Sequence, residues 1–369
     1  LATSAAGRAQ SLTLEQAVAE AAEKYPSVRA SIEQVSAAAA GIDLARTAYL
    51  PRADFLAQAN RATRNNVLGL LFPQSVIPPI SGPVLGASMT NVWGTAVGAL
   101  VSWEPFDFGL RRASVDAAES ARGRANAETA VRRLEAGAAA ADAFLTTLAA
   151  GQVVRAAEAS VERARVMEQS VGALVKAELR PGADTSRAAA ELAAARIQLV
   201  HAEKAEQVSR AALAQLVGAA PAKLEAGPLL RRPAQIETGK QSTAAHPRSV
   251  AQKAAMEVVQ ARQKALDRSF FPQFKLQAAT YGRGTGAHPD GTTGGAASGL
   301  ATNTGNWAVG MTVTFPALEL PSIRARKQIE AFQERAEAAR YDQIARELSA
   351  EAEKARAGLE AARRVAENT

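Results

Sequence analysis

Residues 25–51 read YPSVRASIEQVSAAAAGIDLARTAYLP, and residues 246–272 read HPRSVAQKAAMEVVQARQKALDRSFFP. In each stretch two prolines stand 25 residues apart and enclose an alanine- and glutamine-rich run typical of a helix, and the second stretch begins 221 positions after the first. After each closing proline come an alternating segment, a glycine-rich loop, a second alternating segment and a long charged helix. The sequence therefore predicts one helix–hairpin–helix unit written twice.

The composition argues against compact globular domains. Only 5% of the 369 residues are aromatic and alanine dominates the apolar residues, so a deep core would be poorly filled. Alanine-rich, charge-laced sequence predicts long helices packed side by side. The net charge of +7 would suit nucleic-acid binding, but acids and bases are interleaved, as in RRLE at 132–135. Such interleaving is typical of a solvated helix face, so we expect no nucleic-acid partner.

The sequence contains no cysteine, which excludes disulfides, thiolate metal sites, a cysteine nucleophile and an acylated cysteine within this stretch. Residues 1–11 begin with the small, alanine-rich string LATSAAGRA and are predicted to be the remnant of a secretory signal with a short tail. No transmembrane helix is expected, because the closest candidate, Ala136–Val154, contains Asp142 and is otherwise mostly alanine, glycine and threonine. Contact with a membrane would then require strands.

Two segments alternate clearly enough to be such strands. In Trp93–Trp103 the odd positions are Trp, Thr, Val, Ala, Val and Trp, while the even positions are small or polar apart from Leu100. In WAVGMTVTF at 307–315 one face is apolar and the other is Ala, Gly, Thr and Thr. Apolar residues on one face, small or polar residues on the other and aromatics at both ends are typical of a barrel strand that crosses a bilayer. The alternation alone would equally suit a soluble sandwich.

The terminal aromatics of these segments are the predicted membrane-interface residues, namely Trp93, Trp103, Trp307 and Phe315. The ten steps from Trp93 to Trp103 rise about 33 Å along a strand, which becomes about 24 Å at a tilt of about 45°. That height is close to the apolar band of an outer-membrane barrel.

The helical part of the sequence is too long for a globular domain. Residues 114–177 contain no proline and would span about 95 Å as a helix. A 3-4-3-4 series of Val, Leu and Ala from 131 to 148 predicts a left-handed coiled-coil seam. The chain is predicted to turn at Leu179–Asp184 and to return through 184–217, and the return plus 27–48 would match the outgoing helix in length.

The predicted fold is therefore mainly α with a β part. Long coiled-coil helical hairpins accompany two β-hairpins, which supply four strands. The predicted first repeat is 12–217, with a β-hairpin at 52–106 and a helical hairpin at 112–217. A linker at 218–245 lies at the equator of the helical part. The predicted second repeat is 246–369, with a β-hairpin at 273–316 and a shortened long helix at 322–369.

In this order the segments resemble the TolC-like outer-membrane factor (outer membrane efflux protein) family. The resemblance covers nearly the whole chain and rests on LTLEQAVAEAAEKYPSVRA, LPRADFLAQA, WEPFDFGLRRASVDAAES, ELRPGADTSRAAAELAAARIQL and the second proline-bounded copy. It implies an α-barrel protomer and a homotrimer whose four strands per chain build a shared transmembrane β-barrel in outer-membrane lipid. It also implies the outer membrane of a Gram-negative bacterium, with a large periplasmic portion.

The resemblance also implies the partners, which are a periplasmic adaptor (membrane fusion protein) and an inner-membrane transporter. By the same resemblance the adaptor would dock on the first helical tip, formed by Leu179, Arg180, Pro181, Gly182, Ala183 and Asp184. Pro181-Gly182 is expected to build a tight turn there. The sequence departs from the family at its end: the second long helix is cut short and the second tip is missing, so it is expected to be C-terminally incomplete.

No catalytic, cofactor-binding or metal-binding residue is predicted. The string GRGTG at 282–286 resembles a phosphate loop but follows a strand of membrane type and opens no helix. His201, His246 and His288 lack ligands at metal spacing. Two functions remain open at this point. The first is a passive exit duct of a tripartite efflux or type I export system, and the second is a periplasmic coiled-coil structural or adaptor protein without a membrane barrel.

Overall fold

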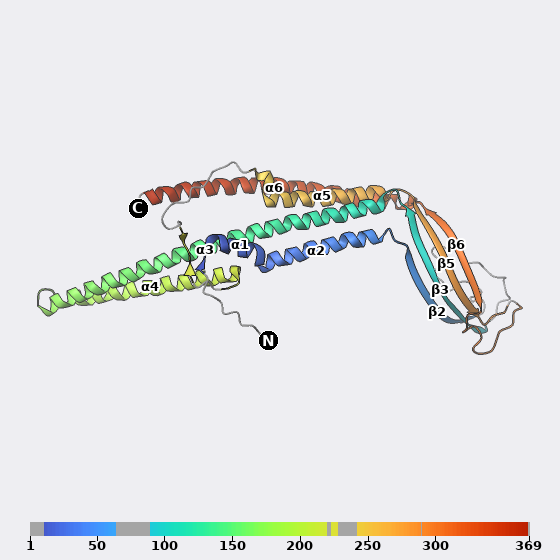
Figure 1. The fold of residues 1–369 in the computed structure, drawn as a ribbon, viewed down its shortest axis with the longest axis horizontal. Coiled ribbons are helices and arrows are strands. Elements are labelled where there is room, and N and C mark those ends of the chain that lie inside the picture. The colour runs from blue at the N-terminus through green and yellow to red at the C-terminus, as the bar shows by residue number, and fades with distance from the viewer. Residues whose placement is uncertain (1–10, 64–88, 220–222, 228–241, 289, 368–369) are drawn as a thin grey trace. The chain divides into compact units, whose positions relative to one another are not determined.

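The structure, a computed structural model, describes residues 11–63, 89–219, 223–227, 242–288 and 290–367 (Figure 1). The predicted signal remnant and most of the predicted linker 218–245 lie outside these residues. The chain divides into two compact units. The helical unit comprises Leu1–Ala37, Gly123–Ala254 and Arg340–Thr369, and the sheet unit comprises Ala38–Arg122 and Ala255–Ala339. Each unit is described by itself.

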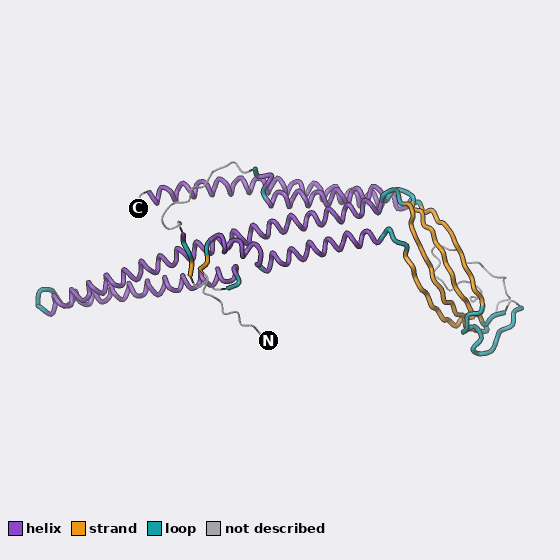
Figure 2. Tube along the Cα trace, viewed as in Figure 1, coloured by secondary structure: helices purple, strands orange, loops and turns teal. Residues whose placement is uncertain are grey.

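The elements confirm a mainly helical fold with a β part (Figure 2). In chain order they are β1 (Ser11–Leu12), α1 (Leu14–Lys24), α2 (Pro26–Thr47), β2 (Arg52–Thr63), β3 (Asn91–Phe106), α3 (Leu110–Lys176), α4 (Gly182–Val217), β4 (Lys223–Leu224), the 3-10 turn η3 (Thr243–Ala245), α5 (Pro247–Arg268), β5 (Gln273–Thr285), β6 (Thr304–Thr314), the 3-10 turn η4 (Ala317–Glu319) and α6 (Leu320–Glu367).

The 221-residue spacing seen in the sequence recurs in the element boundaries. Helices α2 and α5 each have 22 residues and begin at Pro26 and Pro247, 221 positions apart. The strands that follow, β2 and β5, begin at Arg52 and Gln273, again 221 positions apart. Proline suits the first turn of a helix because its missing N–H has no intrahelical partner there. The prolines therefore fix where each repeat begins its helix.

In the helical unit, α1, α2 and α4 all pack on the middle of α3. Phe144 of α3 is fully buried with Leu12, Ala17 and Leu213. One turn away, a second cluster joins small side chains of three helices, namely Ala21, Val28, Ala136 and Ala140. Leu216 near the end of α4 packs on this second cluster, so the end of α4 and the start of α2 meet at the same point of α3.

Two local features hold α1 in this position. Thr13 and Gln16 form a reciprocal capping box at its start, which satisfies two otherwise free backbone N–H groups. Gly137 of α3 lies where an added Cβ would come within 3.2 Å of a methyl of Val18, so the missing side chain lets α1 approach closely. In addition, β1 pairs in parallel with β4.

Helix α3 is the one helix, among the residues described, whose length and apolar content would allow it to cross a membrane. Such content is also typical of a core helix. Within Ala136–Val154 the side chains of Ala136, Ala140, Phe144 and Thr147 are buried, and the first three belong to the clusters just described. This stretch is therefore engaged in helix packing.

The sheet unit contains one antiparallel sheet in the order β2-β3-β5-β6 (Figure 1). Each β-hairpin pairs internally, and the two hairpins join through β3 and β5. The register between β3 and β5 is continuous from Gly94↔Thr285 to Trp103↔Leu276 and then shifts before Phe106. Strands β2 and β6 form the two edges of the sheet.

Candidate membrane surface and partner-contact sites

One face of the sheet is apolar and exposed. Residues paired across antiparallel strands place their side chains on the same face, so the register sorts the sheet into two sides. On the apolar side large side chains of all four strands are exposed, namely Phe55, Val97, Val101, Trp103, Leu276, Trp307, Val309, Met311 and Val313. A soluble sheet would bury such a face, whereas a lipid-facing sheet would expose it.

The opposite face is polar. Its members come from every strand and include Arg52, Asp54, Gln58, Asn60, Ser102, Lys275, Gln277, Asn306, Thr312 and Thr314. Charges on this face are paired, because Arg52 Nε lies 3.1 Å from Asp54 Oδ1 and Lys275 Nζ lies 3.6 Å from Glu104 Oε1. This face therefore suits water rather than lipid and carries little unbalanced charge.

Three of the four predicted interface aromatics lie in strands on the apolar side, and the fourth, Phe315, is exposed and directly follows β6. Trp93 and Trp307 stand near the loop end of β3 and β6, and the Arg61 guanidinium lies 5.5 Å from the centre of the Trp93 ring. Trp103 and Phe315 stand at the helix end, where Trp103 Nε1 donates a hydrogen bond to the Tyr49 carbonyl oxygen at 3.1 Å. Trp307 is 79% exposed.

The strand register shows that Trp93 and Trp307 are not at equivalent positions of the two hairpins. Trp93 lies opposite Arg61, but Trp307 lies opposite Thr280, which corresponds to Ala59 of β2 by the 221-residue spacing. Trp307 therefore corresponds to Thr95 rather than to Trp93. It stands one pleat deeper in the sheet, which leaves the apolar phase of the strand unchanged.

A buried ion pair holds the junction between β3 and α3. The Asp107 carboxylate accepts hydrogen bonds from the Gly109 N–H at 3.1 Å, the Arg111 N–H at 2.6 Å and Arg111 Nε at 2.9 Å. Arg111 also donates to the Ala48 carbonyl oxygen at 3.3 Å, and its guanidinium lies 4.9 Å from the centre of the Tyr49 ring. The ion pair thus connects the end of α2 to the start of α3.

The electrostatics of this junction depend on the hydrogen bonds. Burial alone would raise the pKa of Asp107, but the Arg111 N–H and guanidinium and the Gly109 N–H together hold it below its usual range. The backbone here is unusual, because Phe108 has φ +51° and Gly109 has φ +89°. A non-glycine residue in this region is uncommon and needs its surroundings to hold it.

Those surroundings are an aromatic cluster that joins the two repeats. The Phe108 ring stacks on the Phe271 ring at 5.1 Å and meets the Phe106 ring edge-on at 4.6 Å. Phe274 lies 6.2 Å from both Phe106 and Phe108. Aromatic pairs at these separations add stabilisation beyond the buried area. Phe106 and Phe108 belong to the first repeat, and Phe271 and Phe274 belong to the second.

Sequence analysis quoted this segment among those that carry the family resemblance but did not predict the ion pair or the aromatic cluster. The string FDFGLRR was visible at 106–112, and an Asp placed four residues before an Arg at a helix start is the signal that pointed to the pair. Nothing in the sequence pointed to Tyr49 or Phe271 as their neighbours, because these lie far away along the chain.

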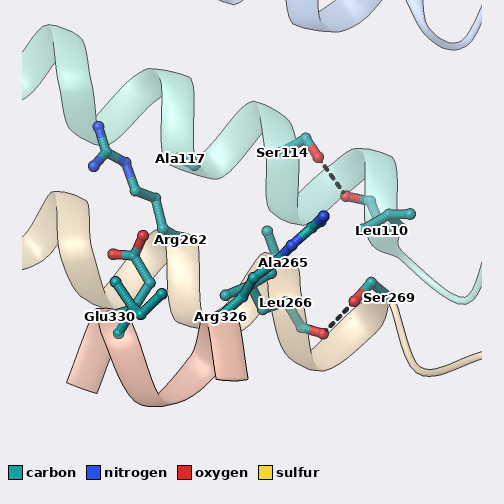
Figure 3. A pocket seen from close by; sticks show the side chains of 10 residues that line it. Leu110, Ser114, Ala117, Arg262, Ala265, Leu266, Ser269, Arg326 and Glu330 are labelled. Carbon is teal, nitrogen blue, oxygen red and sulfur yellow. Dashed lines mark hydrogen bonds between the residues drawn. The ribbon is translucent and has the colours of Figure 1, made fainter. Parts of the chain in front are cut away.

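Next to the junction, α3, α5 and α6 enclose an open cavity of about 470 Å³ (Figure 3). It is lined by Leu110, Ser114, Ala117, Arg262, Ala265, Leu266, Ser269, Arg326, Ile329 and Glu330. The Ser114 and Ser269 hydroxyls each donate to a carbonyl oxygen of their own helix, at 2.9 and 2.7 Å. Neither hydroxyl is therefore aligned with a base as a nucleophile would be.

The tip between α3 and α4 is built differently from the expected tight turn. The chain reverses at Glu178, which has φ +60°, and the Leu179 N–H donates to the Leu174 carbonyl oxygen at 2.9 Å while the Glu178 N–H donates to Val175 at 3.0 Å. This pair of bonds is a Schellman motif with glutamate in the position that glycine usually occupies. The expectation that Pro181-Gly182 forms the turn is wrong, because α4 already begins at Gly182.

The remaining tip residues lie at the surface. Leu179 is 72% exposed, and Arg180 Nη1 lies 3.5 Å from Asp184 Oδ2, so the pair is loose. Pro181, Gly182 and Ala183 are also exposed. The tip therefore presents one apolar side chain beside a pair of opposite charges.

The phosphate-loop resemblance at 282–286 has a structural explanation. Gly282 to Thr285 lie inside β5, and Gly284 and Gly286 sit where an added Cβ would meet the backbone of residues near 300. These glycines allow the loop after β5 to approach the strand, and the described part of that loop contains no helix. Among the described residues no group of three acidic or histidine side chains could hold a metal ion.

Comparisons with known proteins agree with this geometry. The model of the family described as outer membrane efflux protein matches residues 17–219, more than half of the chain. No curated protein matches the sequence.

The fold is similar to solved channel structures. CusC, described as forming a transmembrane channel, gives a TM-score of 0.70 at 13% identity, covering 90% of this chain and 72% of that one. The outer membrane protein VceC of Vibrio cholerae gives 0.62 at 18% identity, covering 90% and 75%. The MtrE outer membrane channel of Neisseria gonorrhoeae gives 0.60 at 17% identity, covering 90% and 70%.

An exposed apolar sheet face, a polar face behind it and long paired helices are features that a membrane-bound duct requires and an enzyme does not. Together with the family match, they establish that this chain belongs to the outer membrane efflux protein family, a family of outer-membrane channels and not of enzymes.

Proposed function

We propose that three copies of this chain form the passive outer-membrane exit duct of a tripartite efflux or type I export system. The duct would dock to a periplasmic adaptor and an inner-membrane transporter. The observation that carries the proposal is the four-stranded sheet, which has one apolar face, one polar face and two edges that no other described strand pairs with.

Association follows from the edges. Backbone N–H and C=O groups on an unpaired edge cannot be left unsatisfied in lipid, so a spanning sheet must close on itself. Four strands are too few, since about eight is the smallest barrel. Three copies would supply twelve strands, which can close around a water-filled interior.

The polar face supports passive transport. Besides its paired charges, Arg52 with Asp54 and Lys275 with Glu104, this face carries mostly uncharged groups and the basic side chain of Arg283. Such a lining selects weakly among solutes, so the choice of cargo would lie with the transporter. No step of chemistry at the duct is required.

The tip supports docking to the adaptor. An exposed leucine at the end of a rigid helical hairpin is a suitable apolar anchor, and Arg180 and Asp184 could exchange their loose contact for charges of the adaptor. The alternative of a periplasmic coiled-coil protein without a barrel leaves the exposed apolar sheet face without a function.

The assignment of the two sheet faces can be tested with neighbouring residues. Met311 lies midway between Trp307 and Phe315 on the apolar face, and Thr312 lies beside it on the polar face. Met311→Arg is expected to cost about 2–4 kcal/mol in the bilayer and to deplete the protein from the outer membrane, whereas Thr312→Arg should insert normally. Membrane fractionation and heat-modifiable migration measure both. Equal insertion of the two variants would contradict a lipid-facing sheet.

Docking can be tested at Leu179. Leu179→Asp should abolish capture of the adaptor and sensitise cells to exported compounds without lowering the amount of protein in the outer membrane. Leu179→Met, which keeps an apolar side chain, is the matched control and should behave as the parent. Normal export and normal adaptor capture by Leu179→Asp would contradict docking at this tip.

A further inference from the structure

The cavity between α3, α5 and α6 carries charged side chains that no other part of the described chain neutralises. Arg262 of α5 and Arg326 of α6 line it, and both extend toward α3 (Figure 3). Neither guanidinium takes part in an ion pair or a hydrogen bond with a residue that the structure describes. Glu330 also lines the cavity, and its Oε2 atom is buried without a hydrogen-bond partner among those residues.

These three groups define the charge that a ligand should bring. Two guanidiniums and one carboxylate leave an excess of one positive charge in the cavity. A phosphate diester carries one negative charge, and guanidinium groups bind its oxygens through paired hydrogen bonds. The buried Oε2 atom of Glu330 needs a donor in addition, because a buried polar atom without a partner is costly. A hydroxyl on the same ligand would supply that donor.

The rest of the lining is mainly apolar. Leu110, Leu266 and Ile329 contribute large apolar side chains, and Ala117 and Ala265 contribute small ones. The volume of about 470 Å³ lies within the range of small-ligand sites, which is about 300–1,000 Å³. A cavity with two cations and an apolar lining suits an amphiphile, which has a charged head and an apolar body.

The aromatic cluster places the cavity beside the lipid-facing side of the sheet. Phe274 of this cluster lies opposite Val313 on that side. Phe108 and Phe271, whose rings stack, each stand two residues along the chain from a residue that lines the cavity.

The depth of the cavity agrees with the position of lipid headgroups. Along α3 the cavity extends from Leu110 to Ala117, which is about 10 Å at 1.5 Å per residue. Headgroups occupy about 5–7 Å beyond the hydrocarbon on each side of a bilayer. The cavity therefore begins at headgroup depth on the side of the membrane where the helices start.

We propose that this cavity binds the headgroup of an anionic phospholipid of the periplasmic leaflet. Arg262 and Arg326 bind the phosphate, Glu330 accepts a hydrogen bond from a headgroup hydroxyl, and the apolar lining contacts the glycerol and the first part of the acyl chains. Phosphatidylglycerol has both the charge and the hydroxyls. Phosphatidylethanolamine is neutral overall and would leave one excess positive charge. The site is additional to the proposed duct and involves neither the adaptor nor the transporter.

Binding can be measured on the full chain purified from the outer membrane and washed free of lipid in detergent. Phosphatidylglycerol, phosphatidylethanolamine and inorganic phosphate are titrated separately, and bound molecules are counted by native mass spectrometry. The parent should bind phosphatidylglycerol several-fold more tightly than phosphatidylethanolamine. Inorganic phosphate, which lacks the apolar body, should not bind at the same concentrations.

Three variants test the residues. Arg262→Ala with Arg326→Ala should weaken phosphatidylglycerol binding about tenfold or more, because charge-assisted hydrogen bonds are lost. The matched control, Arg268→Ala with Arg324→Ala, removes the same charge from the same two helices outside the cavity and should bind as the parent. Glu330→Gln removes the negative charge but keeps an acceptor, so it should strengthen binding several-fold. Loss of folding cannot produce that increase.

The possible failures are distinguishable. Equal binding of the two lipids, binding of inorganic phosphate alone, or equal losses in the cavity variant and its control would overturn the lipid site and leave the duct intact. If the double cavity variant does not fold, Glu330→Gln decides, and unchanged or weaker binding would overturn the site. A parent that fails to insert into the outer membrane would overturn both the site and the proposed duct.

Discussion

Each repeat has a helix contact near the start of its proline-bounded helix. The contact is apolar in the first repeat and made of ion pairs in the second. Near the start of α2, Val28 lies in a buried cluster with Ala136 and Ala140 of α3. Near the start of α5, Arg248 reaches Glu347 and Glu351 of α6 at 2.8 and 3.1 Å. Pro105 and Pro316, which follow the second strand of each hairpin, stand 211 positions apart. By the same spacing Glu347 corresponds to Ala136 and Glu351 corresponds to Ala140.

The reason lies in what covers each contact. In the first repeat α1 packs over the contact through Ala21 and excludes water. In the second repeat η3, a single 3-10 turn, precedes α5 in the described chain. The Glu347 side chain is 40% exposed and the Glu351 side chain is 61% exposed. Small apolar side chains are needed where a third helix packs, and ion pairs are tolerated where water remains.

The two strand-to-helix junctions also differ, because the first is buried and the second is exposed. The first is held by the buried Asp107–Arg111 pair and the phenylalanine cluster. The second passes through η4, where Leu318 is 97% exposed and the Ser322 hydroxyl donates to the Glu319 carbonyl oxygen. The junction between β3 and α3 is therefore held by a buried ion pair and ring contacts, whereas the junction between β6 and α6 has an exposed leucine and a single side-chain hydrogen bond.

The largest expected effect comes from copying the second repeat's charge into the first. Ala140→Glu would bury an unpaired carboxylate at a fully buried site and should cost on the order of 5 kcal/mol. The apparent midpoint of thermal unfolding, followed by helical circular dichroism, measures the loss. The matched reverse change, Glu351→Ala, should leave the midpoint nearly unchanged. Similar effects of the two variants would show that the contacts are not chemically distinct.

The next effect is at the junctions. Arg111→Ala leaves Asp107 buried without its cation and should destabilise the sheet unit by about 3 kcal/mol, lowering the temperature at which the assembled protein dissociates. Ser322→Ala, at the corresponding position of the second junction, should change it by less than about 1 kcal/mol. Equal losses would mean that the ion pair contributes no more than a helix-start hydroxyl.

Two glycines at corresponding strand positions give a third comparison. At Gly98 an added Cβ would lie 2.4 Å from the Thr280 carbonyl oxygen, whereas at Gly310 nothing lies within 4 Å in the single chain. Gly98→Ala should cost about 1–3 kcal/mol through overpacking, and Gly310→Ala should cost much less. Dissociation temperature in detergent again provides the measurement, and a greater loss at Gly310 would show crowding by a neighbouring copy.

A smaller effect is the acid dependence of the first junction. Since the folded pKa of Asp107 lies below its unfolded value of 3.8, the carboxylate stabilises the fold above that value and loses this contribution as the pH falls through the folded pKa. The parent should therefore lose stability below about pH 4 more steeply than Asp107→Asn does. Parallel pH profiles for the two proteins would contradict a stabilising charge at this residue.

The smallest effect concerns the second repeat's ion pairs. Arg248→Ala removes two partly exposed pairs and should cost less than about 1 kcal/mol, and the difference from the parent should shrink further at 1 M salt because exposed charges are screened. Thermal midpoints at low and high salt provide the measurement. A loss comparable to that of Ala140→Glu would show that α5 and α6 depend on these charges.

Sequence analysis recovered the features that local periodicity and punctuation encode. The prolines at 26, 51, 247 and 272 marked both repeats, and alternation in 93–103 and 307–315 identified the strands and their apolar faces. The tip was located but its turn was misassigned, because a Schellman motif can place glutamate in a left-handed conformation when its backbone bonds are satisfied, and Pro181-Gly182 was the stronger local signal.

By itself the sequence determined the mainly helical class and the apolar faces of β3 and β6, because these depend on residues within a few positions of one another. Only the tertiary structure decided that Arg111 lies over Tyr49, that Phe108 stacks on Phe271 and that α1 closes over Ala136 and Ala140. Such contacts join residues far apart in the chain. Their energy depends on burial and distance in three dimensions, which no local pattern of residues specifies.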